Sequence, residues 1–178
     1  MTGRLFAPAA MALLALGACA TDGSADSASA GGETRAALRN AAGEVVATAT
    51  ATPSGDRLRI RLVASGLSAG TFGAHVHAVG RCDPPGFESA GPHWNPAGRQ
   101  HGSQNPQGPH HGDLPNLQVG TDGAGTLEFA IPAATLRGGS ASLLDGDGAA
   151  IVVHAGPDDY RTDPSGNSGA RIACGVFE

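Results

Sequence analysis

The sequence predicts an all-β domain, either a sandwich or a closed barrel. Three observations support this class. Several stretches alternate apolar and polar residues with a period of two, short apolar runs of strand length lie toward the C-terminus, and glycines separate these segments. The segment 34–42 is ambiguous because its alanines would also suit a helix, and we interpret it as a strand. No long helix is indicated.

The strands differ in how clearly the sequence marks them. The segment 45–52 alternates weakly with alanine and threonine, whereas 57–63 places leucine and isoleucine on one face and arginine on the other. A similar alternation recurs in 127–131, and the runs 150–154 and 171–177 are short apolar segments. Turns are predicted at the glycines between strands, which are Gly66, Gly70, Gly120, Gly123, Gly125 and Gly146.

The N-terminal 32 residues precede the predicted domain, which we place at residues 33–178. Residues 1–18 combine an early arginine with an apolar stretch too short to span a bilayer, as is typical of a signal peptide. The stretch ends in Leu-Gly-Ala-Cys, which resembles a bacterial lipobox. We therefore expect cleavage before Cys19, lipidation of that cysteine, and a flexible tether over 19–32. The alternative is an ordinary signal peptide cut near Ala20, with Cys19 removed.

The composition indicates one β-rich domain that does not bind nucleic acid. The chain has 178 residues, with 28 glycines and 12 prolines, yet 40% of its residues are hydrophobic. These values predict a packed core that carries long irregular loops. The formal net charge is −5 and no basic run occurs. A nucleic-acid surface would need a basic stripe.

Only two cysteines, Cys82 and Cys174, lie in the predicted domain. Cysteines that remain in an exported domain usually pair, because the compartment is oxidising. The pair would close a large loop, and restricting the unfolded chain in this way is worth on the order of 4–5 kcal/mol. We interpret the two cysteines as a structural disulfide.

The seven histidines lie in four short pieces of the chain, and none lies elsewhere. Such clustering predicts a transition-metal site, because neutral imidazole is the commonest side-chain ligand for copper and zinc. His75 and His77 stand two apart on an expected strand, so both face the same side. Together with His154 and His93 they would form a set of imidazoles that suits copper.

A second ligand set lies in the irregular interval 80–115. His101, His110 and Asp113 would bind zinc tetrahedrally if His93 supplied a further nitrogen. A deprotonated imidazole can hold one metal on each ring nitrogen, so the two sites would share this ligand. A loop of this length needs a reason to be ordered, and metal ligands supply one.

The sequence motifs, taken in order from about residue 33 to 178, closely resemble those of the copper,zinc superoxide dismutases. This resemblance implies an eight-stranded Greek-key β-barrel, related to the immunoglobulin-like sandwich, with two long loops that form the metal site. It also implies dismutation of superoxide to oxygen and hydrogen peroxide. The motifs are Gly73-Ala74-His75-Val76-His77 followed by Gly80, Ser89-Ala90-Gly91-Pro92-His93-Trp94-Asn95-Pro96, His101-Gly102, His110-His111-Gly112-Asp113-Leu114, Val152-Val153-His154, and Gly166-Asn167 with Arg171-Ile172-Ala173-Cys174-Gly175-Val176.

By motif position, the resemblance implies two metal sites joined by one bridging histidine. The implied copper ligands are His75, His77, His93 and His154. The implied zinc ligands are His93, His101, His110 and Asp113. His111 competes with His110, but the family spacing His-x-Gly-Asp selects His110.

The resemblance also implies roles for three groups beside the metals. Asp158 matches the family's aspartate that accepts hydrogen bonds from one copper and one zinc histidine, and Asp159 is the alternative. Arg171 matches the active-site arginine, whose fixed charge and paired donors suit a small anion. His93 is implied to take and return a proton. The two cysteines match the family disulfide.

Superoxide is the expected substrate. The expected location is the bacterial periplasm or cell envelope, with the protein attached to a membrane by a lipid on Cys19. We expect the protein to be either a monomer or a homodimer. The interval 155–170 holds Arg161 as its single cation beside three aspartates, which argues against strong steering of an anion.

Two alternatives remain open at this point. The domain could store copper and zinc without catalysis, or its histidines could serve only to order loops.

Overall fold

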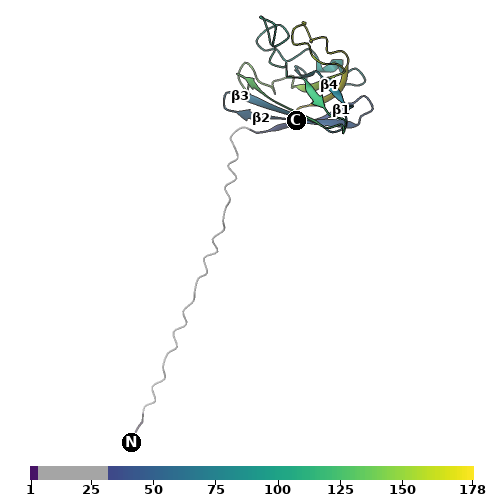
Figure 1. Cartoon of the computed structure of the whole chain (residues 1–178). Coiled ribbons are helices and arrows are strands. Elements are labelled where there is room, and N and C mark those ends of the chain that lie inside the picture. Colours follow the sequence, from purple (N-terminus) through teal and green to yellow (C-terminus); the bar gives the residue numbers. More distant parts are fainter. Residues whose placement is uncertain (4–31) are drawn as a thin grey trace.

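The computed structural model describes residues 1–3 and 32–178, and its regular secondary structure consists almost entirely of β-strands (Figure 1). The predicted signal peptide, the lipidation site at Cys19 and most of the tether lie outside the described residues. A short 3-10 helix, η1 (Glu88–Ala90), interrupts one long loop. The strands are β1 (Thr34–Asn40), β2 (Val45–Ser54), β3 (Arg57–Ala64), β4 (Gly70–Phe72), β5 (Ala74–His77), β6 (Leu117–Val119), β7 (Gly125–Pro132), β8 (Ala150–His154) and β9 (Arg171–Val176).

The strands form a Greek-key β-barrel, as the resemblance implies. Seven of them make one antiparallel sheet in the order β5-β8-β9-β1-β2-β3-β7, and β4 pairs with β6. Only Gly73 separates β4 from β5, so the segment 70–77 belongs to both sheets. A tight turn, in which the Gly120 N–H donates to the Ala124 carbonyl over 2.9 Å, connects β6 to β7. Counting β4 and β5 as one interrupted strand turns the nine strands found among the described residues into the expected eight.

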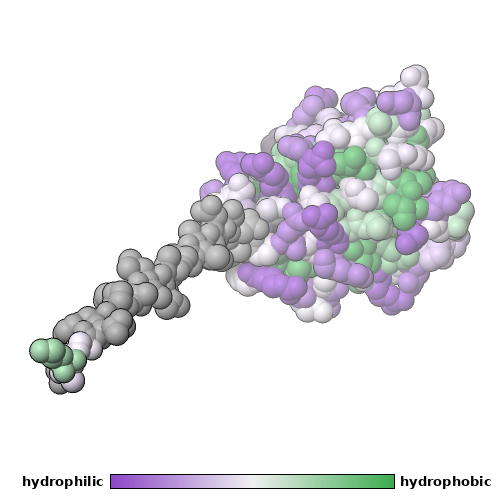
Figure 2. Space-filling model, turned by 90° about the horizontal axis from the view of Figure 1, so that it is seen from below, coloured by the Kyte–Doolittle hydropathy of each residue, from purple (hydrophilic) through white to green (hydrophobic). Residues whose placement is uncertain are grey.

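The strands predicted from alternation are confirmed. Along β3, Leu58, Ile60 and Leu62 are fully buried, while the arginines between them are exposed. The ambiguous segment forms β1, because it pairs with β2 over most of its length. Figure 2 shows the resulting surface from below, where hydrophilic residues are interspersed with smaller apolar areas. Two predicted turn glycines, Gly70 and Gly125, instead begin strands.

The two long irregular segments lie together on one side of the barrel, at the top of Figure 1. Hydrogen bonds connect them directly. The His101 N–H donates to Asp163 Oδ1 over 2.7 Å, and Arg161 Nε donates to Gln104 Oε1 over 2.8 Å. The segment after β5 and the segment after β8 therefore together cover the strands that carry the histidines.

The predicted disulfide is confirmed between Cys82 and Cys174, whose Cα atoms are 5.6 Å apart. It attaches the first long loop to β9. Throughout the described ranges 1–3 and 32–178, no helix is both long and apolar enough to cross a membrane.

Candidate metal centre

Strand β5 carries the first two histidines of the site, and its neighbour β8 carries another. His75 and His77 are fully buried in β5, and His154 ends β8, which is paired antiparallel to β5. The long loop then folds back along β5. Isolated backbone bridges set His93 opposite His77 and Asp113 opposite His75. The fold thus brings residues from three separate segments against one strand.

Backbone hydrogen bonds around Val76 hold the two ends of this loop in place. The Val76 carbonyl accepts from the Trp94 N–H over 2.8 Å, and the Val76 N–H donates to the Gly112 carbonyl over 2.9 Å. The Gly112 N–H in turn donates to the Trp94 carbonyl over 2.8 Å. A Cβ atom at Gly112 would lie 2.2 Å from the Val76 oxygen, so this position requires glycine. The contact places His93 and Asp113 beside each other.

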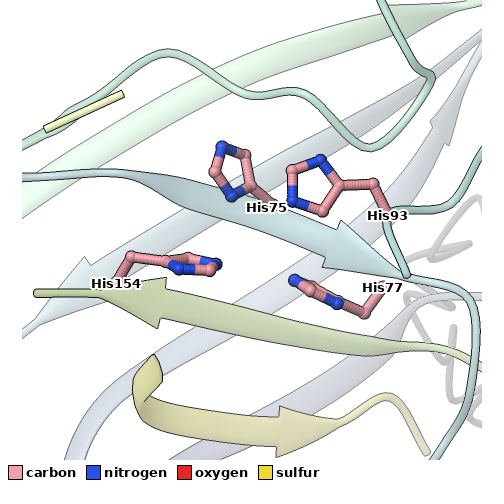
Figure 3. A group of neighbouring side chains, drawn as sticks. All are labelled: His75, His77, His93 and His154. Carbon is pink, nitrogen blue, oxygen red and sulfur yellow. The ribbon is translucent and has the colours of Figure 1, made fainter. Parts of the chain in front are cut away.

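Four histidines direct ring nitrogens toward one point, as Figure 3 shows. One nitrogen of each ring is buried and makes no hydrogen bond within the described part of the chain. A buried nitrogen without a partner is costly, and four facing the same point fit a bound cation. The unpartnered atoms are His75 Nδ1, His77 Nε2, His93 Nε2 and His154 Nε2.

The opposite ring nitrogens of three of these histidines are fixed by hydrogen bonds. His77 Nδ1 lies 2.8 Å from the Gly91 carbonyl, and His154 Nδ1 lies 3.0 Å from the Gly169 carbonyl. His75 Nε2 lies 2.8 Å from Asp158 Oδ2. Carbonyl and carboxylate oxygens accept protons, so these nitrogens donate and the free nitrogens are left as metal-binding lone pairs.

Burial keeps these imidazoles neutral. It lowers the pKa of His75 to about 3, that of His77 to about 2 and that of His154 to about 4. Burial also lowers the pKa of His93. Neutral imidazole is the form that binds a metal, so each of the four rings can bind one metal without losing a proton first. Only a histidine that holds a metal on each nitrogen must also lose its remaining N–H proton.

A second group of donors surrounds Asp113. Its Oδ1 lies 2.9 Å from His93 Nδ1, 3.0 Å from His101 Nδ1 and 3.1 Å from His110 Nδ1. Burial alone would raise the pKa of Asp113, but hydrogen bonds from these three histidines hold it well below its usual range. Three imidazoles and one carboxylate are a donor set that zinc accepts. His93 faces the first group with Nε2 and this group with Nδ1.

Asp158 connects the two groups. Its Oδ2 accepts from His75, and its Oδ1 lies 3.0 Å from Nε2 of His101. Burial alone would lower the pKa of His101, but the hydrogen bonds to Asp113 and Asp158 raise it to about 9. The alternative residue, Asp159, is exposed and instead accepts hydrogen bonds from Thr162.

Two residues that the sequence reasoning missed hold Asp158 in place. The Asp158 N–H donates to Asn116 Oδ1 over 2.8 Å, and Asn116 Nδ2 donates to the Asp158 carbonyl over 2.9 Å. The Tyr160 N–H donates to Asp158 Oδ1 over 2.6 Å, and the Tyr160 hydroxyl accepts from the Asn116 N–H over 2.9 Å. Neither residue is a metal-ligand type, so no motif marks them.

His111 does not join either group. Its ring packs edge-on against the buried ring of Trp94, with centroids 5.4 Å apart. Burial lowers its pKa, and the nearby Arg99 lowers it further. The neighbouring His110 is the residue that faces Asp113.

Arg171 begins β9 directly opposite His154 in the strand pairing. Its guanidinium donates from Nη1 to the Phe87 carbonyl over 2.8 Å and from Nη2 to the Gly91 carbonyl over 2.9 Å. Phe87 has a left-handed backbone with φ of 56°, another feature that the sequence does not reveal. Arg171, His77, His93 and His154 line one groove of about 530 Å³. The groove therefore offers a fixed positive charge beside the four histidines.

Comparisons with known proteins agree with this arrangement. A family model described as copper/zinc superoxide dismutase matches residues 41–177. The chain is 42% identical over 148 residues to superoxide dismutase [Cu-Zn] 1 of Aquifex aeolicus, covering 82% of this chain and 88% of the relative. It is 46% identical over 134 residues to superoxide dismutase [Cu-Zn] of Caulobacter vibrioides, and the match covers 74% of this chain and 76% of the relative. The crystal structure of a SOD-like protein from Bacillus subtilis matches with a TM-score of 0.76 at 41% identity, and the match covers 80% of this chain and 96% of that one.

The Greek-key barrel and the single histidine shared between two groups of metal donors together define the class of this protein, which is a metal-binding β-barrel. The chain belongs to the copper/zinc superoxide dismutase family.

Proposed function

We propose that this chain dismutates superoxide to oxygen and hydrogen peroxide at a copper and zinc centre joined by His93. The observation that carries the proposal is the placement of the two His93 ring nitrogens, which face two different donor groups. The proposed copper ligands are His75, His77, His93 and His154. The proposed zinc ligands are His93, His101, His110 and Asp113.

The donor chemistry fits these metals. Four neutral imidazoles suit copper, and three imidazoles with one carboxylate suit zinc. When bound, copper supplies one-electron chemistry, and zinc supplies a fixed positive charge without changing its valence. Asp158 orients one imidazole of each set through its two oxygens, which face Nε2 of His75 and Nε2 of His101. The Nδ1 atoms of the two rings are thereby turned toward their own donor groups.

The protein's own groups bind the anion and move a proton. Arg171 is held by two carbonyls and leaves the positive charge of its guanidinium at the groove, where it binds superoxide. His93 also lines this groove, and its Nε2 is the atom that takes a proton and gives it back to the product. Two superoxide ions and two protons yield one oxygen molecule and one hydrogen peroxide.

Replacing Arg171 with alanine is expected to lower superoxide turnover while leaving the metal content unchanged. The guanidinium donates its hydrogen bonds to backbone carbonyls and to none of the proposed ligands, so its loss removes the anion-binding charge while every ligand side chain is kept. Removing one such charge-stabilising donor typically costs about 10²–10³ in rate. Elemental analysis and a superoxide assay on the same preparation measure both quantities. Unchanged turnover would favour a protein that only stores copper and zinc.

We further propose that the domain works in the bacterial cell envelope, held by a lipid on Cys19, as an antioxidant defence. The lipobox-like sequence and the Cys82–Cys174 disulfide support this location, because disulfides persist in oxidising compartments. Mass spectrometry of the mature N-terminus tests it. A mature chain that begins after Cys19 would contradict lipid attachment. Either a monomer or a homodimer remains the expectation, and sedimentation velocity decides between them.

A further inference from the structure

Glu88 places a negative charge at the same groove that the proposed substrate, an anion, must enter. It lies in η1, lines the groove with Arg171, and its side chain is 83% exposed. Its Oε2 lies 3.7 Å from Nη2 of Arg171. The carboxylate thus stands beside the charge to which we assign superoxide binding.

Arg171 does not need Glu88 to keep its position. Both terminal nitrogens of the guanidinium donate to backbone carbonyls, those of Phe87 and Gly91. The carbonyl of Glu88 accepts from the Gly91 N–H over 3.0 Å, and this contact is independent of the side chain. The Glu88 carboxylate therefore adds charge at the groove without being part of the support for Arg171.

Two other charged side chains line this groove. Asp163 accepts from the backbone N–H of His101 and therefore helps to hold the irregular segment 80–115. Arg99 is exposed, and within residues 32–178 no carboxylate forms an ion pair with it. Glu88 is consequently the carboxylate of the groove that lies beside Arg171 and holds no loop through its side chain.

We propose that Glu88 weakens anion capture by Arg171 and so limits the rate at which superoxide binds. The inference rests on the proposed role of Arg171 in superoxide dismutation. An incoming anion meets the repulsion of the carboxylate and competes with it for the same guanidinium. Because Glu88 is exposed, salt screens the effect, and it fades as the ionic strength rises.

Replacing Glu88 with glutamine tests the proposal, because it removes the charge and keeps the size of the side chain. Inorganic phosphate serves as the anionic probe, titrated into the zinc- and copper(I)-loaded protein while the ¹⁵N–¹H signal of Arg171 Nε is followed by NMR. At low ionic strength we expect the dissociation constant for phosphate to fall about 1.4- to fivefold, the factor that corresponds to the coupling energies typical of exposed ion pairs. Glu88→Lys should lower it further, and the differences should shrink strongly as the salt concentration approaches about 1 M, where the Debye length of about 3 Å is shorter than the 3.7 Å separation of the two charges.

The chain offers a matched control in Asp56, which is also an exposed carboxylate beside an arginine. Its Oδ1 lies 4.0 Å from Nε of Arg57, in the connection between β2 and β3. Asp56→Asn changes the net charge by the same amount but should leave phosphate binding unchanged. An unchanged or weaker affinity in Glu88→Gln would overturn the proposal, and so would an equal gain in Asp56→Asn.

The second-order rate constant for superoxide, measured on the same proteins, should rise by a similar factor in Glu88→Gln. This measurement separates the inference from the function on which it rests. If the chain did not dismutate superoxide, every variant would lack turnover, while the phosphate titration would still report the effect of Glu88.

Discussion

Replacing His93 with alanine is expected to abolish superoxide turnover and to weaken the binding of both metals. The imidazole faces the four-histidine group with Nε2 and the Asp113 group with Nδ1, so one substitution removes a donor from each set. The remaining copper set would have three imidazoles, and the remaining zinc set two imidazoles and a carboxylate. We expect turnover to fall below the detection limit and the zinc content to drop together with the copper content.

His111 provides the matched control, because it lies next to the zinc set and its ring packs on Trp94 without joining either donor group. His111→Ala should retain both metals and most of the activity. Elemental analysis after dialysis and a superoxide assay measure these quantities. A His93→Ala protein that kept full zinc and full turnover would refute the bridging role.

Removing the disulfide is expected to give the largest loss of stability. The bond between Cys82 and Cys174 spans a sequence separation of 92 residues. Opening a loop of that size returns conformational entropy to the unfolded chain worth about 4–5 kcal/mol. We expect the free energy of unfolding of the metal-free double variant Cys82→Ser, Cys174→Ser to fall by about this amount in urea titrations.

The wild-type protein after reduction serves as the control and should unfold at the same urea concentration as the double variant. Activity should also fall, because the disulfide fixes the loop whose Phe87 and Gly91 carbonyls hold Arg171. A double variant as stable as the oxidised protein would mean that the loop is held by its other contacts. In that case the entropic account of the bond would be wrong for this chain.

Strands with several alternating residues could be predicted from the sequence, and very short strands could not. In β3, arginines alternate with the buried Leu58, Ile60 and Leu62, so its buried face is visible in the sequence. β4 and β6 have three residues each, too few to show a period. Their pairing is decided by the tertiary fold, because β4 continues into β5 and β6 leads into β7.

The same distinction applies to the site. The side chains proposed as ligands are histidines and one aspartate in recognisable motifs, so their identity could be proposed without a structure. The groups that position them are ordinary residues whose role depends on where the loops meet. Asn116 and Tyr160 hold Asp158 through contacts across the two irregular segments, and Phe87 presents a carbonyl through an uncommon backbone angle. Composition and spacing carry no signal for such contacts.

The carbonyl oxygen of Gly91 accepts from His77 Nδ1 and also from Arg171 Nη2. One peptide unit therefore sets the distance between Arg171, where the substrate is proposed to bind, and His77, which is proposed to hold the redox ion. The main chain fixes this distance, so substitutions of neighbouring side chains leave it unchanged unless they shift the peptide plane. Variation on the groove rim can thus alter how fast an anion arrives while the distance over which the electron moves stays the same.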